Sequence, residues 1–274
     1  MRSAFVDLSI RQLTELDISS ATALSVAAGW NQTAADWELL LRLHPEGCLG
    51  IECDGKIVAT TTLICYQDQL AWLGMVLTHS EYSGRGFARR LVEQALRIAE
   101  AKKVRSVKLD ATDQGRPLYE SLGFRKEQSV ERWLADSGSF AGIDPIPSGA
   151  MPDFEMDREA FGVDRSKVLK EMAAAACVFV AADGFAMLRT GARASYIGPC
   201  VARSPESAKT LLELCLGVRG EQCYWDLFPS NRGAVNIAEE LNFTVQRRLV
   251  RMVKGADVRG DESMIYAGAG FELG

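Results

Sequence analysis

Residues 77–91 join an apolar, strand-like segment to an amphipathic helix through a turn that contains Gly84 and Gly86. Glycine reaches backbone conformations that other residues avoid, so such a turn can aim several backbone N–H groups at one point. The helix dipole places positive potential at the same point. This strand–turn–helix unit therefore predicts an anion-binding cradle, and a pyrophosphate is the anion that suits it best.

The composition of the chain indicates its broad class. Of its 274 residues, 47% are hydrophobic and 24% are charged, and the net charge is −5. That length exceeds what one compact core usually holds, so we expect two domains. The negative charge argues against broad binding to nucleic acid. We identify no signal peptide and no membrane-spanning run, and we therefore expect a cytoplasmic protein without a membrane partner.

The cysteines and histidines limit the redox and metal chemistry. The chain has an odd number of cysteines and no CxxC pair, which is typical of reduced thiols in a cytosolic protein. With only two histidines, His44 and His79, we expect no metal site. The cysteines are Cys48, Cys53, Cys65, Cys177, Cys200, Cys215 and Cys223.

Hydrophobic spacing and turn residues predict the elements of the first half of the chain. Thr33 is a suitable N-cap, Asp54 and Gly55 form a hairpin turn, and Gly123 is a natural helix end. The expected helices cover residues 10–28, 33–43, 86–102 and 116–122. The expected strands cover residues 48–53, 57–66, 70–78, 104–109 and 124–133.

The second half of the chain repeats this order. Asp183 and Gly184 give another hairpin signal, and Ser204 with Pro205 opens another helix. Leu122-Gly123-Phe124 and Leu241-Asn242-Phe243 lie 119 positions apart. We therefore predict two copies of one domain, which we call the first copy (residues 1–135) and the second copy (residues 154–274). A segment rich in Gly, Pro and Ser, residues 136–153, is the expected linker.

The cradle could also belong to a dinucleotide site. Gly84-x-Gly86-x-x-Arg89 partly imitates the dinucleotide fingerprint, and Asp110 lies near the expected place of a ribose-binding acid. However, Arg89 replaces the third glycine, about 70 residues precede the unit, and no alternating βαβ series follows. A turn with a purely structural role is the remaining alternative.

The segment downstream of the cradle indicates its ligand. Asp110-Ala111-Thr112, followed by the run from Gly115 through Tyr119 to Leu122-Gly123-Phe124, resembles the second signature of the GNAT acetyltransferase superfamily. Ser83-Gly84-Arg85-Gly86-Phe87-Ala88 is similar to its first signature, Arg/Gln-x-x-Gly-x-Gly/Ala, and departs from it at Ser83. The resemblance implies an α+β fold of two GNAT-like domains, each a mixed, mostly antiparallel sheet flanked by helices.

The resemblance also implies acetyl-CoA as the cofactor. Its pyrophosphate would bind the N–H groups of the cradle, and its pantetheine arm would pair like an extra strand with residues 76–78. A backbone N–H near Leu77 would polarise the thioester carbonyl. The cofactor-binding residues expected on this basis are Val76, Leu77, Thr78, Ser83, Gly84, Arg85, Gly86, Phe87, Ala88, Arg89 and Tyr119.

Three residues are candidates for the catalytic proton transfers. Tyr119 matches the family position of the acid that protonates the departing thiolate; its alternative role is to pack the short helix on the sheet. Asp110 and His79 are the candidate bases, and their alternative roles are a turn carboxylate and a surface turn residue. The family often releases the proton to bulk water, so a single base need not exist.

The acceptor site is expected near two tryptophans that precede the first hairpin. Trp30, Asn31, Asp36 and Trp37 lie where the family places its substrate-side helices. Aromatic rings with a carboxylate would accept a cationic amine. The alternative is that the tryptophans anchor these helices to the core.

The sequence thus predicts an N-acetyltransferase that transfers acetyl directly to the primary amine of a small molecule. A protein lysine or N-terminus is the alternative acceptor, and a non-catalytic acyl-CoA-binding sensor is the alternative class. At the offset of 119 the second copy has Ala238 in place of Tyr119 and Pro205 in place of Gly86. We therefore expect the second copy not to bind coenzyme A. The chain is expected to be a monomer or a homodimer.

Overall fold

In this computed structural model, the structure describes residues 9–135, 149–218 and 222–274. The chain divides into two compact units, residues 1–107 and residues 108–274, which we call unit 1 and unit 2. Each unit is described by itself.

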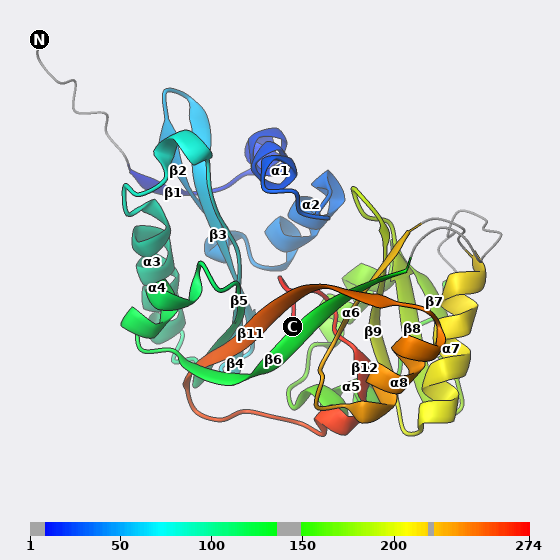
Figure 1. Ribbon diagram of the computed structural model, residues 1–274. Coiled ribbons are helices and arrows are strands. Elements are labelled where there is room, and N and C mark those ends of the chain that lie inside the picture. Colours follow the sequence, from blue (N-terminus) through cyan, green and yellow to red (C-terminus); the bar gives the residue numbers. More distant parts are fainter. Residues whose placement is uncertain (1–8, 136–148, 219–221) are drawn as a thin grey trace, which may run out of the picture. The chain divides into compact units, whose positions relative to one another are not determined.

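Unit 1 is an antiparallel sheet of order β1-β2-β3-β4 with helices packed on it (Figure 1). The strands are β1 (Ile10–Gln12), β2 (Leu49–Cys53), β3 (Lys56–Tyr66) and β4 (Leu70–Thr78). The helices are α1 (Ile18–Ala27), α2 (Ala34–Leu43) and α3 (Phe87–Ala101). Three short 3₁₀ turns are η1 (Glu15–Asp17), η2 (Pro45–Gly47) and η3 (Ser80–Tyr82). The buried residues of α3 fall on one helical face, which packs on β3 and β4.

Local turn chemistry explains most of unit 1. Asp54 and Gly55 have φ of +51° and +76°, the backbone that a two-residue hairpin needs, and they join β2 to β3 as predicted. Thr33 caps α2, which also confirms the prediction. The helix predicted over 10–28 was wrong at its start, because residues 10–12 pair with β2 as a strand and the helix begins only at Ile18.

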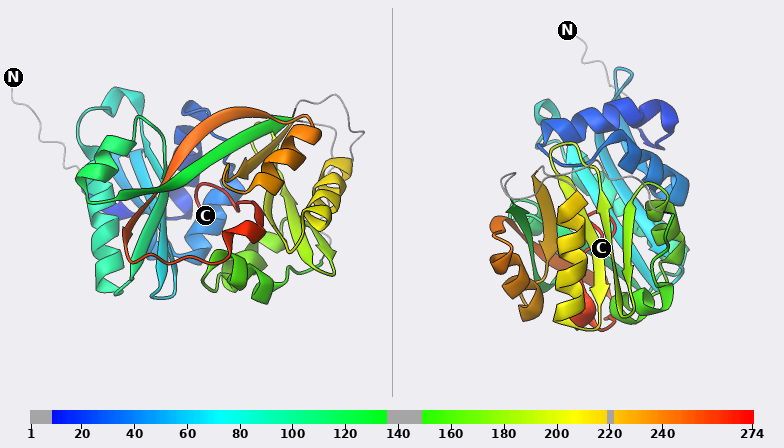
Figure 2. Two further views of the ribbon diagram at one scale, coloured as in Figure 1. Left: turned by 60° about the horizontal axis from the view of Figure 1, so that its bottom comes forward. Right: turned by 90° about the vertical axis from the view of Figure 1, so that its right-hand side faces the viewer.

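Unit 2 contains a mixed sheet of order β5-β11-β6-β10-β9-β8-β7, in which β9 and β10 are parallel and β12 pairs with β9. Helix α7 packs on β7, β8 and β9 (Figure 2). The strands are β5 (Ser106–Ala111), β6 (Arg125–Ala135), β7 (Cys177–Ala181), β8 (Gly184–Arg189), β9 (Ser195–Ala202), β10 (Cys223–Leu227), β11 (Thr244–Gly255) and β12 (Ile265–Ala267). The helices are α4 (Arg116–Ser121), α5 (Phe154–Phe161), α6 (Ser166–Ala173), α7 (Pro205–Val218) and α8 (Arg232–Glu240), with a 3₁₀ turn η4 (Glu262–Met264).

The two copies exchange their longest strands in unit 2, β6 and β11. Strands β6 and β11 run antiparallel side by side, from Thr244 opposite Leu134 to Val253 opposite Arg125 (Figures 1 and 2). The other neighbour of β6 is β10, which belongs to the second copy. The other neighbour of β11 is β5, which belongs to the first copy. Each long strand therefore lies between two strands of the opposite copy.

This exchange explains why the compact units differ from the sequence repeat. Most of the first copy lies in unit 1, but its α4 and β6 belong to unit 2 together with the second copy. The boundaries 1–135 and 154–274 therefore stay a prediction from the repeat. Of the predicted linker, residues 136–148 lie outside the described residues, and Asp153 already caps α5 by accepting from Glu155 N and Met156 N.

All seven cysteines are free thiols. Burial raises the pKa of Cys48 to about 12 and that of Cys65 to about 11, so both stay protonated at neutral pH. Within the described ranges, no group of three or more His, Cys, Asp or Glu residues could hold a metal ion. Over the same described ranges, no helix has the length and apolarity that crossing a membrane requires.

Candidate active site

The predicted cradle forms the start of α3 in unit 1. Gly84 and Gly86 have φ of +76° and +77°, a left-handed conformation that costs other residues about 1–2 kcal/mol. Gly86 is the N-cap of α3 and has no side chain that could accept from the N–H groups of the first turn. A Cβ atom at either glycine would meet nothing within 4 Å. The first turn of α3 thus offers backbone donors to an anion.

Aromatic and cationic side chains support this turn. The Arg85 guanidinium lies over the Tyr82 ring, 4.9 Å from its centroid, and donates to the Glu81 carbonyl oxygen (3.1 Å). Tyr82 in turn stacks on Phe87, which is buried. Ser83, where the family signature has Arg or Gln, donates from its backbone N to Ser80 O (3.2 Å). Arg85 therefore adds positive charge beside the helix N-terminus.

Strand β4 carries a β-bulge just before this turn. Leu77 pairs with Thr60 and Gly74 pairs with Thr62, so Met75 and Val76 together face the single residue between those partners. Met75 has φ of +50°, and its carbonyl oxygen accepts from the Thr60 hydroxyl (2.8 Å). A bulge of this kind redirects backbone groups out of the regular ladder. It falls among the residues expected to pair with the pantetheine arm, Val76, Leu77 and Thr78.

Tyr119 lies on α4 in unit 2 and is buried. Its ring packs edge-to-face against Phe124, with centroids 5.9 Å apart. Burial raises the pKa of Tyr119 well above the ordinary tyrosine value, so its hydroxyl stays protonated at neutral pH. A neutral phenol can donate a proton, which fits the predicted role as acid for a thiolate.

Asp110 on β5 faces Arg251 on β11. Arg251 donates to both carboxylate oxygens, through Nε and Nη2, at 2.9 Å each. Both side chains are buried, with exposures of 0% and 5%. Burial opposes the charge of Arg251, but Asp110 attracts it, and the net effect raises the pKa of Arg251. This bidentate ion pair favours a structural role for Asp110 over that of a catalytic base.

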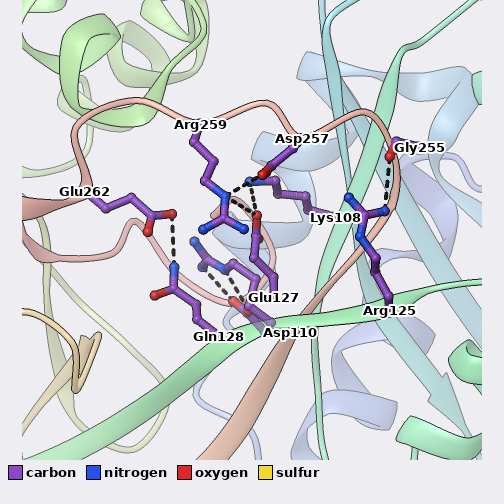
Figure 3. Close-up of polar contacts among 10 residues, drawn as sticks. Lys108, Asp110, Arg125, Glu127, Gln128, Gly255, Asp257, Arg259 and Glu262 are labelled. Carbon is purple, nitrogen blue, oxygen red and sulfur yellow. Dashed lines mark hydrogen bonds and ion pairs between the residues drawn. The ribbon is translucent and has the colours of Figure 1, made fainter.

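The Asp110 pair belongs to a larger group of charged side chains (Figure 3). Glu127 on β6 faces Lys108 on β5 at 2.8 Å and Arg259 at 3.2 Å. Burial lowers the pKa of Lys108, against the attraction of Glu127. The group joins strands of the first copy to the segment that follows β11. Lys108, Glu127 and Arg251 could not be identified from the sequence, because nothing in a strand pattern shows that β5, β6 and β11 become neighbours.

His79 lies in the turn between β4 and the cradle. Its Nδ1 accepts from the backbone N of Glu81 (3.4 Å), and its ring meets Tyr82 edge-on, with centroids 5.9 Å apart. These contacts cap η3 and favour the alternative of a surface turn residue.

Most contacts of the predicted acceptor-binding residues stabilise α2 and its packing on the core. The Asp36 carboxylate accepts from the backbone N and hydroxyl of Thr33 (2.7 and 2.8 Å), which completes a capping box at the start of α2. Trp37 is fully buried and donates from its indole N–H to the Ser25 hydroxyl (3.2 Å). Asn31 is also buried, whereas Trp30 is half-buried. Trp37 thus anchors α2 to the core, and of the two tryptophans Trp30 alone retains part of its surface.

The sequence candidates fall in both units. The cradle, residues 76–79 and the acceptor candidates from Trp30 to Trp37 belong to unit 1, whereas Asp110 and Tyr119 belong to unit 2. Within unit 2, Asp110 and Tyr119 lie on the consecutive elements β5 and α4.

The equivalent helix start in the second copy, that of α7, is built differently. Ser204 caps it by accepting from Ser207 N (3.2 Å), and Pro205 has no N–H to offer. Glu206 adds a carboxylate to the first turn. This helix N-terminus lacks one donor, has a side-chain acceptor on another and carries a carboxylate, so it would repel an anion.

Comparisons with known proteins agree with this architecture. A model of the GNAT acetyltransferase family matches residues 11–124, and a GNAT acetyltransferase domain model matches residues 154–267. An uncharacterised N-acetyltransferase of Bacillus subtilis, YitH, is 28% identical over 76% of this chain and 78% of its own length. A holothin acyltransferase of a Pseudoalteromonas species is 22% identical over 91% of this chain and 89% of its own.

Solved structures show the same fold. The crystal structure of a proposed acetyltransferase from Pyrococcus horikoshii has a TM-score of 0.85 and 23% identity, and the match covers 100% of this chain and 98% of that one. A tandem GNAT protein from the clavulanic acid biosynthesis pathway has a TM-score of 0.63 and 15% identity, covering 92% and 99% of the two chains. With one family match in each half, this chain belongs to the GNAT family of acyltransferases and carries two GNAT domains in tandem.

Proposed function

We propose that this enzyme transfers an acetyl group from acetyl-CoA directly to the primary amine of a small molecule, with one working site in the first copy. The observation that carries the proposal is the uncapped start of α3, where Gly84 and Gly86 hold the backbone in a left-handed turn. An acyl-CoA pyrophosphate matches the charge and the donors offered there. The bulge of β4 directly precedes this turn, which suits the binding of the pantetheine arm.

Acetyl transfer from a thioester to an amine has three requirements. The acceptor amine must lose its proton, the thioester oxygen must be stabilised, and the departing thiolate needs a proton. An alkylammonium with a pKa of about 10.4 is rarely neutral at pH 7, and deprotonating it costs roughly 4–5 kcal/mol. Asp110 and His79 are both engaged in structural contacts, which supports release of that proton to water rather than to a side chain. The neutral phenol of Tyr119 is the proposed proton donor.

A small-molecule acceptor is preferred over a protein acceptor for one reason. The Pseudoalteromonas relative, which matches nearly the whole chain, is named for a compound that it acylates. The test is a thiol-release assay in which the full chain and acetyl-CoA meet a panel of small primary amines and a panel of lysine and N-terminal peptides. We expect turnover with at least one small amine. Turnover with peptides alone would assign the protein acceptor, and coenzyme A binding without any turnover would assign the sensor.

A single substitution tests the cradle. Ala88 is the second residue of α3, the position that Glu206 holds in α7. We expect Ala88→Glu to weaken acetyl-CoA binding about tenfold or more, because like charges at close range repel by several kcal/mol near a protein surface. The fold should keep its stability, since a carboxylate is favourable at a helix N-terminus. Isothermal titration calorimetry and thermal unfolding measure the two quantities.

The matched control for this test is Glu206→Gln at the equivalent position of α7. It removes a first-turn carboxylate from the second copy and is expected to leave acetyl-CoA affinity unchanged. Equal affinities of the wild type and Ala88→Glu would show that the pyrophosphate binds elsewhere.

A further inference from the structure

In the second copy, two parallel strands separate partway along their length. Strands β9 and β10 pair from Ser195 opposite Cys223 to Ile197 opposite Trp225, and their ladder ends there. Beyond that point β9 continues to Ala202 and leads to the start of α7. Strand β9 and α7 correspond in chain order to β4 and α3 of the first copy, the elements proposed to bind acyl-CoA.

The chain's own residues 265–268 fill the place where β9 and β10 separate. Strand β12 pairs antiparallel with β9, with Ile265 opposite Val201 and Ala267 opposite Cys200. On the other side, Gly268 N donates to the Asp226 carbonyl oxygen on β10 (2.9 Å). The Trp225 indole N–H, also from β10, donates to the Tyr266 carbonyl oxygen (2.6 Å). The segment is therefore hydrogen-bonded to both separated strands.

The fit of this segment is close. Every residue of β12 is buried. A Cβ atom on Gly198, where φ is +148°, would lie 2.0 Å from the Gly268 carbonyl oxygen, so only glycine fits at that position. The same oxygen accepts from the Tyr196 hydroxyl (3.0 Å). These contacts hold residues 265–268 against the two strands.

We propose that residues 265–268 are a built-in occupant of the second copy's acyl-CoA groove, so that this groove is permanently closed. The inference rests on the proposed function, in which an acyl-CoA arm pairs with the equivalent strand of the first copy. Buried backbone N–H and C=O groups need partners, and a cofactor could enter only by displacing β12 and leaving its polar groups unpaired. The self-capped start of α7 removes the second half of the same binding site.

Amide hydrogen exchange, monitored by mass spectrometry, tests directly whether residues 265–268 stay in the groove. With the full chain alone, the amides of residues 265–268 should exchange slowly, and saturating acetyl-CoA should not change their rate. A peptide covering β4 and the start of α3 should gain protection on addition of acetyl-CoA and serves as the internal control. Fast exchange of 265–268 in the free protein, or loss of protection on adding acetyl-CoA, would overturn the inference.

Calorimetry separates this inference from the proposed function. The wild type should bind one acetyl-CoA per chain, and Ala88→Glu should leave no binding of comparable affinity. Two equivalents in the wild type would place a cofactor in the second copy and contradict this inference. One tight equivalent in Ala88→Glu would do so only if acetyl-CoA also changed the exchange of residues 265–268, and without that change it would contradict the cradle alone. If the wild type did not bind acetyl-CoA at all, the proposed function would be overturned instead. The hydrogen-exchange rates of residues 265–268 would still decide whether β12 closes the groove.

Discussion

Replacing Tyr119 by phenylalanine is expected to lower kcat about 10²-fold or more, the usual scale for loss of a proton-transfer group. The edge-to-face contact with Phe124 does not need the hydroxyl, so the fold should persist. Acetyl-CoA affinity should stay within about twofold, because the phenol acts on the leaving thiolate rather than on the pyrophosphate. Steady-state kinetics with the best amine of the panel, together with calorimetry, provides the two measurements.

The control is Tyr266→Phe, which removes a buried phenol from the second copy and should leave kcat unchanged. The pH profile gives an independent reading. Burial raises the pKa of Tyr119, so its proton is present throughout neutral and moderately alkaline pH. The wild-type rate should therefore rise with pH as the acceptor amine deprotonates. Deprotonation of Tyr119 should not lower the rate at any pH below about 10, the ordinary pKa of tyrosine. A Tyr119→Phe enzyme with near-native kcat would falsify the assignment.

Substituting Arg132 by methionine is expected to lower the free energy of unfolding by about 3–5 kcal/mol, the range for breaking a buried ion pair from one side. Arg132 on β6 donates to both oxygens of Asp226 on β10, at 2.7 and 2.6 Å, and both side chains are almost fully buried. Burial opposes the charge of Arg132, but Asp226 attracts it, and the net effect raises the pKa of Arg132. The guanidinium also lies 4.3 Å from the Phe271 ring centroid. The substitution would leave Asp226 charged and without this partner.

Two variants identify the cause of that loss. The double variant Arg132→Met with Asp226→Leu removes both charges and should recover most of the stability, because neither member of this pair is left buried without the other. Arg203→Met breaks an exposed pair with Glu159 and should cost far less. Urea unfolding followed by circular dichroism measures all of them. If the single and double variants lose equal stability, packing rather than the ion pair is responsible.

The same arrangement occurs twice in the molecule. Arg132 and Arg251 lie 119 positions apart, on the two exchanged strands, and each takes both oxygens of an aspartate from the opposite copy. Each guanidinium also lies over an aromatic ring, and for Arg251 this is Phe228 at 4.7 Å. The Arg132–Asp226 pair thus links β6 to β10, and the Arg251–Asp110 pair links β11 to β5. We expect Arg251→Met to reproduce the loss seen with Arg132→Met.

Local signals made much of the fold predictable from the sequence. The Asp54-Gly55 turn, the Thr33 cap and the left-handed Gly123 each act through their immediate neighbours, and each lies where the sequence analysis expected it. The glycine turn and the start of α3 were predictable for the same reason, because both are local features. That they bind an anion stays a prediction. Strand β4 matches its predicted range of 70–78.

Long-range pairing was not predictable in this way. An amphipathic strand such as β6 fits equally well beside a strand of either copy, so its pattern cannot reveal the exchange. The sequence suggests the carboxylate of Asp36 as an amine ligand but cannot show that this carboxylate also accepts from the backbone N and the hydroxyl of Thr33. Helices α5 and α6 and the short strand β12 were not identified from the sequence. The ends of α5 carry local signals, the N-cap Asp153 and the left-handed Gly162, that lie beside or within the segment taken for a linker. Strand β12 has only three residues and owes its place to its pairing with β9.

The exchange of β6 and β11 also bears on how this protein can evolve. If the second copy were deleted, β5 and β6 would each lose the neighbour that β11 provides, and Asp110 would lose its guanidinium. Selection would then remove truncations of the gene even if all acyl transfer took place in the first copy. The second copy is therefore under structural selection whichever copy carries out the chemistry, and its freedom to change is greatest where it does not touch the exchanged strands.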